Sequence, residues 1–417
     1  MMNARQFEGL DWLRFGLACY LILFHTARSY VEGPSGLFGL LSLGNFATSC
    51  FFVLSGFLLT WVYVAVRSSA PIGRRAFLIN RLSALYPLHL LTFALAFLIA
   101  FVNKAGVGAV VARVSPFSDE YRTLGGLETT FNVVNHLTLT HAWNPAYLIF
   151  NVPSWSISAL LFFYLLFPFI AVRLFRVQQH VAVLLALGIL FAIPGVVVTL
   201  FAWYDPIIFG VLHRNPLLRL PLFLAGIILC SMYVARVRSG QDALDWRATA
   251  GLSILLVVSL TAAGVLLAGK PVVPPAFINT GLYYLPALAT VWMAAHWAGS
   301  GHPRSAYWAS RLGKASLSMF ALHLPLFRVL LRIEFLAVDY LPRLITGKGL
   351  AHIVPQTDYT PVPLLYPLYF LIIVAASVAL QERVVDPVQA YVKRRFVRPG
   401  TAGPAVREKS PGSISTA

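Results

Sequence analysis

Charged residues are scarce in this chain of 417 residues: they make up 11% of it, while 58% is hydrophobic. That apolar fraction excludes intrinsic disorder, which requires low hydrophobicity, and it exceeds what a single soluble globule can bury. The three cysteines, Cys19, Cys50 and Cys230, all fall within apolar stretches, so neither a disulfide framework nor a thiolate metal site is expected. These deficits predict a polytopic membrane protein.

Acidic residues are the scarcest charged class, with 15 Asp and Glu against 32 Lys and Arg. Only Asp11 and Glu382 are expected to touch a membrane span, which argues against carboxylate-pair catalysis and against mid-membrane carboxylate relays. The basic residues punctuate apolar runs and form no stripe, so nucleic acid is not an expected partner. Motifs for nucleotide hydrolysis, zinc proteolysis and α/β-hydrolase chemistry are absent from the sequence.

Ten apolar runs are bounded by charges or by Pro and Gly, and each is long enough to cross a bilayer as a helix. Their continuity favours helices over the alternating strands of a membrane barrel. The expected fold is therefore an all-α membrane bundle of about ten transmembrane helices. The predicted spans are 10–30, 43–65, 84–103, 155–174, 181–202, 217–235, 248–268, 278–298, 315–333 and 364–382.

The distribution of Lys and Arg predicts the orientation. With both termini cytoplasmic, about two thirds of the 32 basic residues lie on the inner side, as the positive-inside rule requires. Residues 1–395 are then one integral-membrane domain, and 396–417, rich in Pro, Gly, Ser and basic residues, is predicted to be a disordered tail. The longest outer connections, 104–154 and 334–363, are candidates for shaping an outward-facing site.

The first predicted span carries a polar pattern that suggests chemistry. Arg14 follows Asp11 by nearly one turn, so the two side chains can pair. His25 follows Arg14 by eleven residues, which places both on one helix face about 16 Å apart. A neutral His25 could act as a general base. Two structural alternatives stay open: the Asp–Arg pair could anchor the helix, and His25 could be a packing residue.

His323 lies in the middle of the ninth predicted span, and Pro325 follows it closely. Proline has no N–H, so we expect it to free a carbonyl one turn earlier for another hydrogen bond. His323 is a second-tier candidate for positioning a substrate. The alternative is that it hydrogen-bonds between helices without a role in catalysis.

The remaining histidines are weaker candidates. His89 and His296 are predicted to lie near cytoplasmic helix ends, at the membrane interface. His136 and His141 are five residues apart, a poor spacing for one helix face, and no Cys or carboxylate cluster lies nearby. We therefore expect no metal site.

Several segments of the chain form an ordered series of motifs. They are residues 10–14 and 23–25, 50–57, 80–87, 153–158 with Tyr164 and Pro168, 315–325, and 382–383. Taken in this order, and across nearly the whole chain, they resemble the motifs of the acyltransferase 3 family of integral-membrane O-acyltransferases.

The resemblance implies an enzyme that moves an acyl group from a cytoplasmic donor, usually acetyl-CoA, to a hydroxyl. Family acceptors are commonly envelope carbohydrates or glycolipids and sometimes secondary metabolites. By position, His25 would be the catalytic histidine, either a general base or a transient acyl carrier, and Arg14 its motif partner. Arg81 would face the donor. No bound cofactor is implied, and the setting would be a bacterial cytoplasmic (inner) membrane.

The sequence suggests binding or positioning roles for further residues, beside those of His25, Arg14 and Arg81. Arg74 and Arg75 precede Arg81 in the richest short inner loop and could bind the phosphates of acyl-CoA. Asp11, Ser156 and His323 are candidates for holding or positioning the acceptor.

Two positions depart from the family pattern. Ala84 stands where a second Arg is usual, and Leu160 where a Glu is usual. Two other hypotheses therefore remain: a transporter or flippase whose path is lined by Arg14, His25 and His323, and a family member with weakened activity. The lack of visible internal repeats and the scarcity of membrane carboxylates count against transport.

Overall fold

The computed structural model describes residues 7–30, 39–66, 73–103, 106–113, 120–268, 276, 278–347 and 359–397. These residues are mostly helical, as predicted, and the four short strands form two antiparallel hairpins, β1–β2 and β3–β4. The strands are β1 (Val102–Asn103), β2 (Gly106–Val107), β3 (Val111–Arg113) and β4 (Tyr121–Thr123). The helices, with short 3-10 and π turns labelled η, are α1 (Glu8–Thr26), η1 (Ala27–Tyr30), α3 (Gly44–Thr60), η2 (Trp61–Ala65), α4 (Arg74–Ala100), α5 (Gly126–Leu137), η3 (His141–Trp143), η4 (Val152–Ser154), α6 (Trp155–Phe175), α7 (His180–Leu200), α8 (Pro206–Arg214), α9 (Pro216–Arg238), α10 (Trp246–Ala268), η5 (Ile278–Leu282), α12 (Tyr284–His296), α13 (Pro303–Phe335), η6 (Leu336–Tyr340), α14 (Leu341–Ile345), η7 (Pro363–Leu365), α15 (Tyr366–Leu380), η8 (Gln381–Val385) and α16 (Asp386–Phe396).

Each of the ten predicted spans falls on helix in the structure. Among the described residues, seven helical segments are long and apolar enough to cross a membrane. The predicted spans 10–30, 278–298 and 315–333 fall outside these seven: α1 carries three charges, α12 has only 13 residues, and α13 is punctuated by Arg and Lys. An all-α membrane protein is thus supported.

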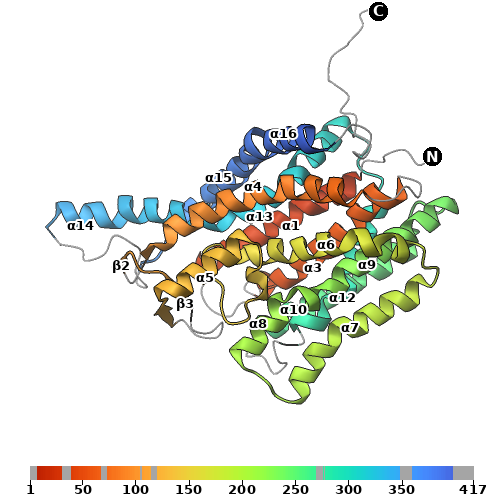
Figure 1. Cartoon of the computed structure of the whole chain (residues 1–417), viewed down its shortest axis with the longest axis horizontal. Helices are drawn as coiled ribbons and strands as arrows, with labels where there is room; N and C mark the ends of the chain where they lie inside the picture. Colours follow the sequence, from red (N-terminus) through yellow and green to blue (C-terminus); the bar gives the residue numbers. More distant parts are fainter. Residues whose placement is uncertain are drawn as a thin grey trace, which may run out of the picture.

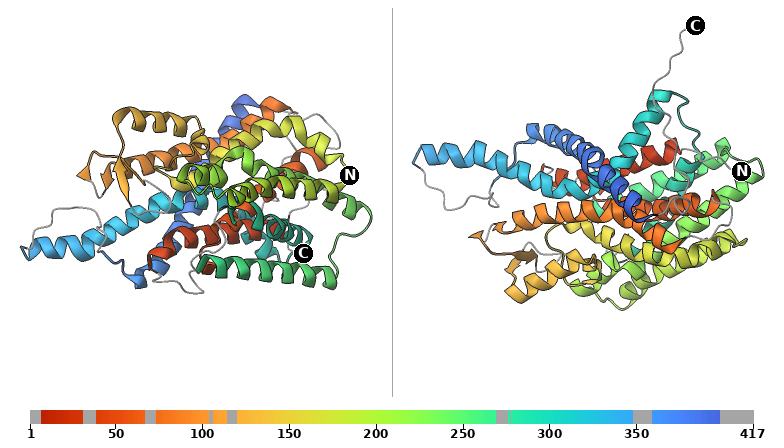
Figure 2. Two further views of the ribbon diagram at one scale, coloured as in Figure 1. Left: turned by 90° about the horizontal axis from the view of Figure 1, so that it is seen from below. Right: turned by 45° about the horizontal axis from the view of Figure 1, so that its top comes forward.

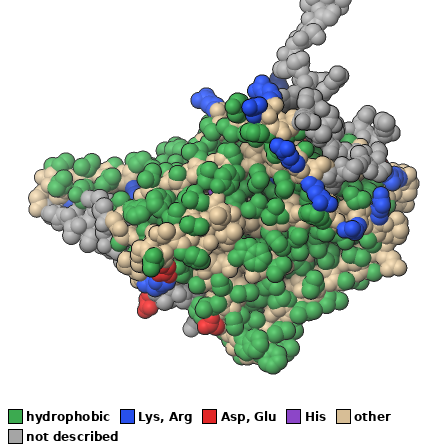
Figure 3. Space-filling model, viewed as in Figure 1, with side chains coloured by type: hydrophobic (Ala, Val, Ile, Leu, Met, Phe, Trp, Pro, Cys, Tyr) green, Lys and Arg blue, Asp and Glu red, His purple; other side chains and the backbone are tan. Residues whose placement is uncertain are grey.

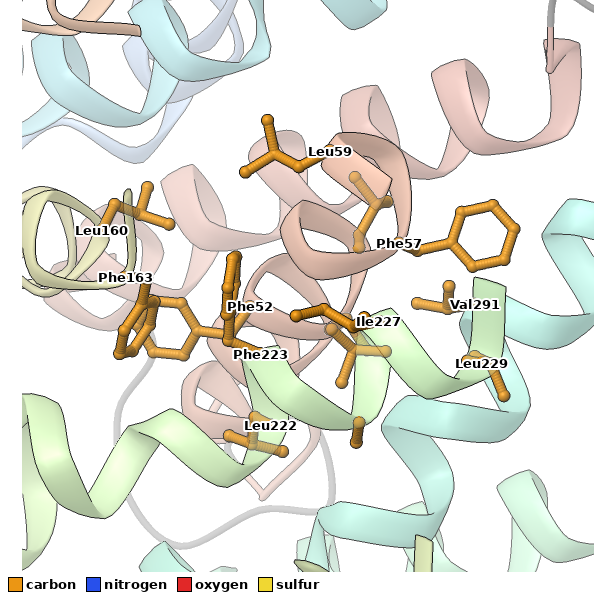
Figure 4. Packing of buried hydrophobic residues seen from close by; sticks show 14 of the residues in the cluster. Phe52, Phe57, Leu59, Leu160, Phe163, Leu222, Phe223, Ile227, Leu229 and Val291 are labelled. Atoms are coloured by element: carbon orange, nitrogen blue, oxygen red, sulfur yellow. The ribbon is translucent and has the colours of Figure 1, made fainter. Parts of the chain in front are cut away.

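The bundle is built around two helix pairs. α1 packs against α13, and α3 against α9, with α6 and α7 also lying on α9 (Figure 1). α15 covers α13, while α16 lies along α4 (Figure 2). Aromatic side chains fill the space between α3, α6 and α9, where the rings of Phe52 and Phe223 each lie within 5.3 Å of Phe163, centroid to centroid (Figure 4).

Glycines let α3 and α9 approach closely. A Cβ on Gly56 would overlap the carbonyl oxygen of Phe223, and a Cβ on Gly226 would overlap that of Val53. The contact is reciprocal, as in membrane helix pairs whose small residues bring the backbones together. Lipid is as apolar as leucine, so this close van der Waals fit is a main source of helix association.

We expect Gly226→Ala to destabilise the bundle, because the added methyl group must push two backbones apart. The expected loss is about 1–3 kcal/mol, seen as a lower melting temperature of the purified protein. Gly251→Ala in α10 is the matched control, since a Cβ there meets nothing within 4 Å. A melting temperature that falls equally in both variants would contradict the close contact.

The surface separates into an apolar belt and a basic end. Figure 3 shows hydrophobic side chains over most of one face, with Lys and Arg gathered at one end of the bundle. Leu185 and Ile189 of α7 and Val257 of α10 are exposed, as expected for side chains that face lipid. The end that carries the start of α4 and α16 is therefore the polar, basic side of the molecule.

Several helices extend beyond the predicted boundaries. α4 begins at Arg74, ten residues before the predicted span, and α13 runs for 33 residues and continues through η6 and α14 as a projecting arm (Figure 1). α16 was not predicted as a helix, because its 11 residues are too polar for a span. Of the predicted tail, residues 398–417 lie outside the described residues.

Candidate active site

The structure brings His25 and His323 into contact. His25 lies in the last turn of α1, and His323 lies fully buried in α13. The Nδ1 atom of His25 is 3.1 Å from the Nε2 atom of His323, and the ring centroids are 4.9 Å apart. Two candidates that the sequence separates by 298 residues therefore form one pair.

The partners of these rings define their tautomers. The Nδ1 atom of His323 lies 2.7 Å from the carbonyl oxygen of Phe320, which can only accept, so Nδ1 carries the proton and a neutral ring accepts at Nε2. The Nδ1 atom of His25 faces the carbonyl oxygen of Leu21 at 2.8 Å as well as His323. It therefore donates, which leaves the lone pair of a neutral His25 on Nε2, where a general base needs it.

Arg14 and Asp11 lie at the basic end of α1. The Nη1 atom of Arg14 is 3.7 Å from Oδ1 of Asp11, and both side chains are partly exposed, which confirms the predicted pairing. Eleven residues of helix separate Arg14 from His25, about 16 Å along the axis. Arg14 thus lies at the opposite end of the same helix face and does not contact the histidine pair.

Of the three predicted donor-binding arginines, Arg81 joins Arg14. Its Nη2 atom donates to the hydroxyl of Tyr63 at 3.1 Å, and its guanidinium interacts electrostatically with Arg14. Arg74 and Arg75 are exposed at the start of α4, where Arg74 lies over the ring of Phe169 with 4.2 Å to the centroid. The cluster at the basic end is thus centred on Arg81 and Arg14.

Ser156 lies in the first turn of α6, and its hydroxyl donates to the carbonyl of Pro153 at 3.2 Å. Its neighbours contact the connection 104–154, which the sequence predicts on the outer side and which is called the outer loop below. Ser158 donates to the carbonyl of Leu139, and Ser154 contacts the Nε2 atom of His141 at 3.0 Å. Ser156 as a positioning residue stays a prediction. Leu160, where the family usually has Glu, points into the aromatic core in Figure 4.

A residue that the sequence did not single out, Asn151, holds the outer loop on α13. Its Nδ2 atom donates to the carbonyl of Ala321 at 2.8 Å, and the side chain is buried. Ala321 precedes Pro325 by four residues, so this is the carbonyl that the proline frees. The prediction of a freed carbonyl beside His323 is confirmed, although the sequence did not indicate its donor.

We expect Asn151→Ala to cost about 1–3 kcal/mol, because the buried carbonyl of Ala321 loses its donor. In the double variant Asn151→Ala/Pro325→Ala, residue 325 has an N–H that can donate to the carbonyl of Ala321. Part of the lost stability should therefore be recovered. Thermal unfolding of the four proteins measures the coupling. Strictly additive losses would contradict the assignment.

Three histidines stack where the outer loop meets α4. The rings of His136 and His141 lie 4.1 Å apart and nearly parallel, and His89 lies 5.6 Å from His141. All three are buried, and His89 lies against the loop that carries His136 and His141, so its predicted place near a cytoplasmic helix end is wrong. His296 is the last residue of α12 and is buried, and its predicted place at the membrane interface stays a prediction. The turn after α5 places His136 and His141 together despite their spacing. Among the residues that the structure describes, no group of three His, Cys, Asp or Glu could hold a metal ion.

This stack predicts acid sensitivity. Burial lowers the pKa of His136 to about 4 and that of His141 well below its usual value, with neighbouring histidines adding to both shifts. The unfolded chain binds protons near pH 6.5, so stability is full above that pH and is lost as the pH falls toward 4. The melting temperature should therefore drop between pH 7 and 5, and His136→Phe, which keeps a stacked ring, should reduce that drop. An unchanged slope would contradict the prediction.

Two buried acids, Glu8 and Glu334, were not among the residues predicted to touch a span, which were Asp11 and Glu382. Glu8 accepts a hydrogen bond from Ser300 at 3.0 Å, and Glu334 accepts from Tyr359 and Tyr369 at 2.7 Å each. Both lie where α1 and α13 extend past the apolar runs. Each joins a helix end to a neighbouring segment.

Comparison of the sequence with known proteins agrees with this architecture. Residues 7–382 match the sequence profile of the family described as "Acyltransferase domain", the acyltransferase 3 family. The protein named Acyltransferase MdmB, from Streptomyces mycarofaciens, is 33% identical over 165 residues, which are 38% of this chain and 37% of the relative. The match thus spans little more than a third of either protein. No solved structure matches the chain. Because the family profile covers nearly the whole chain, the protein belongs to this family of integral-membrane acyltransferases.

Proposed function

We propose that the protein transfers an acyl group, expected to be acetyl, from a cytoplasmic acyl-CoA to a hydroxyl of a carbohydrate or glycolipid. The observation that carries this proposal is the hydrogen-bonded pair of His25 and His323, reached along α1 from the cationic cluster of Arg14 and Arg81. The cations suit the phosphates of CoA. The flexible pantetheine chain would span the distance to His25.

In the proposed reaction, the Nε2 atom of His25 takes the proton of the acceptor hydroxyl as its oxygen attacks the thioester carbonyl. The C–O bond forms, the C–S bond breaks, and the CoA thiolate leaves with the proton returned by His25. His323 accepts from Nδ1 of His25 and holds the ring in the tautomer that this step needs. Transient acylation of His25 is the alternative order of the same bonds.

The proposed setting is a bacterial cytoplasmic membrane with both termini inside. The gathering of Lys and Arg at one end of the bundle (Figure 3) supports that orientation under the positive-inside rule. The donor would enter there, near Arg81, with Arg74 and Arg75 at the exposed start of α4. The acceptor would approach from the opposite end, beneath the outer loop that Asn151 attaches to α13.

The proposal is tested with purified protein in lipid nanodiscs supplied with acetyl-CoA and candidate glycan acceptors. Release of free CoA thiol, together with an acetyl-mass increase on the acceptor, is the expected result. Mass spectrometry of envelope glycans with and without the protein would identify the acceptor and the acyl group.

Two other outcomes would favour the competing hypotheses. Solute flux in liposomes without an acyl donor would favour a transporter. Absence of turnover with every acyl-CoA and native acceptor would favour a weakened member, in line with Ala84 and Leu160.

A further inference from the structure

The cationic cluster at the inner end extends beyond Arg14 and Arg81. Lys314 of α13 attracts the carboxylate of Asp11 electrostatically. Lys393 of α16 lies near enough to Arg81 for their like charges to repel each other. Four helices, α1, α4, α13 and α16, thus bring four cations to one place. Neither lysine belongs to the segments that carry the family resemblance.

Packing contacts fix both lysines there. Gly313 meets the backbone of Asp11 so closely that a Cβ would lie 3.0 Å from its Cα, which places the adjacent Lys314 beside that carboxylate. On α16, Gln389 donates from Nε2 to the carbonyl of Asn80 at 3.1 Å. Lys393 follows Gln389 by one turn of α16, and Arg81 is the residue after Asn80 in α4, so this contact brings both cations to the junction of the two helices.

The cluster has more positive than negative charge. Among the residues that the structure describes, Asp11 and Asp386 are the carboxylates that interact with these cations, and Asp386 also accepts from Gln381 at 2.7 Å. The Nε atom of Arg81 is buried and has no hydrogen-bond partner among the described residues. Like charges held this close repel each other, and a polyanion would offset that repulsion and supply the missing acceptor.

We propose that Lys314 and Lys393 complete, with Arg14 and Arg81, a phosphate site for the nucleotide half of a coenzyme A thioester. The inference rests on the proposed function and adds to it the residues that select a phosphorylated donor. α16 contributes one wall of the site by lying along α4. Anionic lipid headgroups share the phosphate chemistry and are the competing source of the ligand.

Binding measurements test this site without requiring turnover. The full chain in phosphatidylcholine nanodiscs is titrated with CoA and with pantetheine, which has no phosphate. Lys393→Gln and Lys314→Gln should each weaken CoA binding about tenfold, as expected for one lost charge-assisted hydrogen bond, and leave pantetheine binding unchanged. Lys393→Arg should retain most of the affinity.

The matched controls are Arg395→Gln on α16 and Arg304→Gln on α13, both exposed and of the same charge. Equal effects in controls and test variants would overturn the proposal, as would equal binding of CoA and pantetheine to the unmodified protein. If phosphatidylglycerol nanodiscs abolish the lysine dependence and CoA does not bind, the site is for lipid headgroups and the proposal is wrong.

The proposed reaction and the proposed phosphate site can fail separately. Lysine-dependent CoA binding without any acyl transfer would contradict the proposed reaction alone. Acyl transfer from acetyl-CoA with no lysine dependence would contradict this site alone.

Discussion

Replacing His25 with alanine is expected to lower the rate of acyl transfer by about two to four orders of magnitude, the range that general-base catalysis supplies. The Nε2 lone pair of His25 is the proposed acceptor of the hydroxyl proton, and alanine offers no substitute. The KM for the acyl-CoA donor should change little, because the proposed phosphate site lies about 16 Å away at the other end of α1. Thiol release from protein at matched membrane levels measures both parameters.

The control for His25→Ala is His302→Ala, which removes an exposed imidazole before α13. It should leave kcat and KM unchanged. Retained activity in His25→Ala at matched levels would rule out the proposed role of this residue. A rise in KM without a fall in kcat would move His25 from the chemical step to donor binding.

Replacing His323 with alanine is expected to lower kcat by about a hundredfold, the cost of a catalytic group misplaced by about 1 Å. The variant removes one of the two acceptors that face Nδ1–H of His25 and leaves the Leu21 carbonyl alone, so the ring of His25 is held less firmly in its orientation. His323→Gln should recover much of the loss, because the amide oxygen of glutamine can accept where Nε2 did. This rescue separates a positioning role from simple filling of space.

His323→Ala also leaves a void in a fully buried position, so its melting temperature has to be measured beside kcat. Comparable stability of the alanine and glutamine variants, with activity only in the latter, would support positioning. If glutamine is as inactive as alanine while both remain folded, the hydrogen bond to His25 is not what positions the ring.

The helices could be predicted because their signal is local. Each apolar run reports its own length, and the bilayer imposes a minimum that soluble folds lack. The ends were harder to predict. α13 continues through Glu334, because protein contacts outside the apolar run satisfy a carboxylate that lipid would not.

Only those features of the candidate site that lie within a single helix could be predicted from the sequence. The spacing of Arg14 and His25 depends on helical periodicity alone, and the proline that frees the carbonyl of Ala321 also acts within its own helix. The contact between His25 and His323, and the choice of Asn151 as donor, depend on which helices pack together. Nothing in the local pattern encodes that choice.

His89 shows why position along a span is not enough. Its predicted place near a cytoplasmic end suited a polar side chain at an interface, but the outer loop brings His136 and His141 against it. Lys393 is a comparable case. In the sequence it belongs to a polar segment after the last span, and only the packing of α16 on α4 brings Lys393 near Arg81.

The sequence by itself determined an apolar, basic, all-helical membrane protein of the acyltransferase 3 family, with Arg14 and His25 on one helix face. These features follow from composition and from the period of a single helix. Only the tertiary structure decided that His323 is the partner of His25 and that Lys314 and Lys393 lie near Asp11 and Arg81. Such contacts form between helices far apart in the chain, and their register is set by close packing at positions such as Gly313.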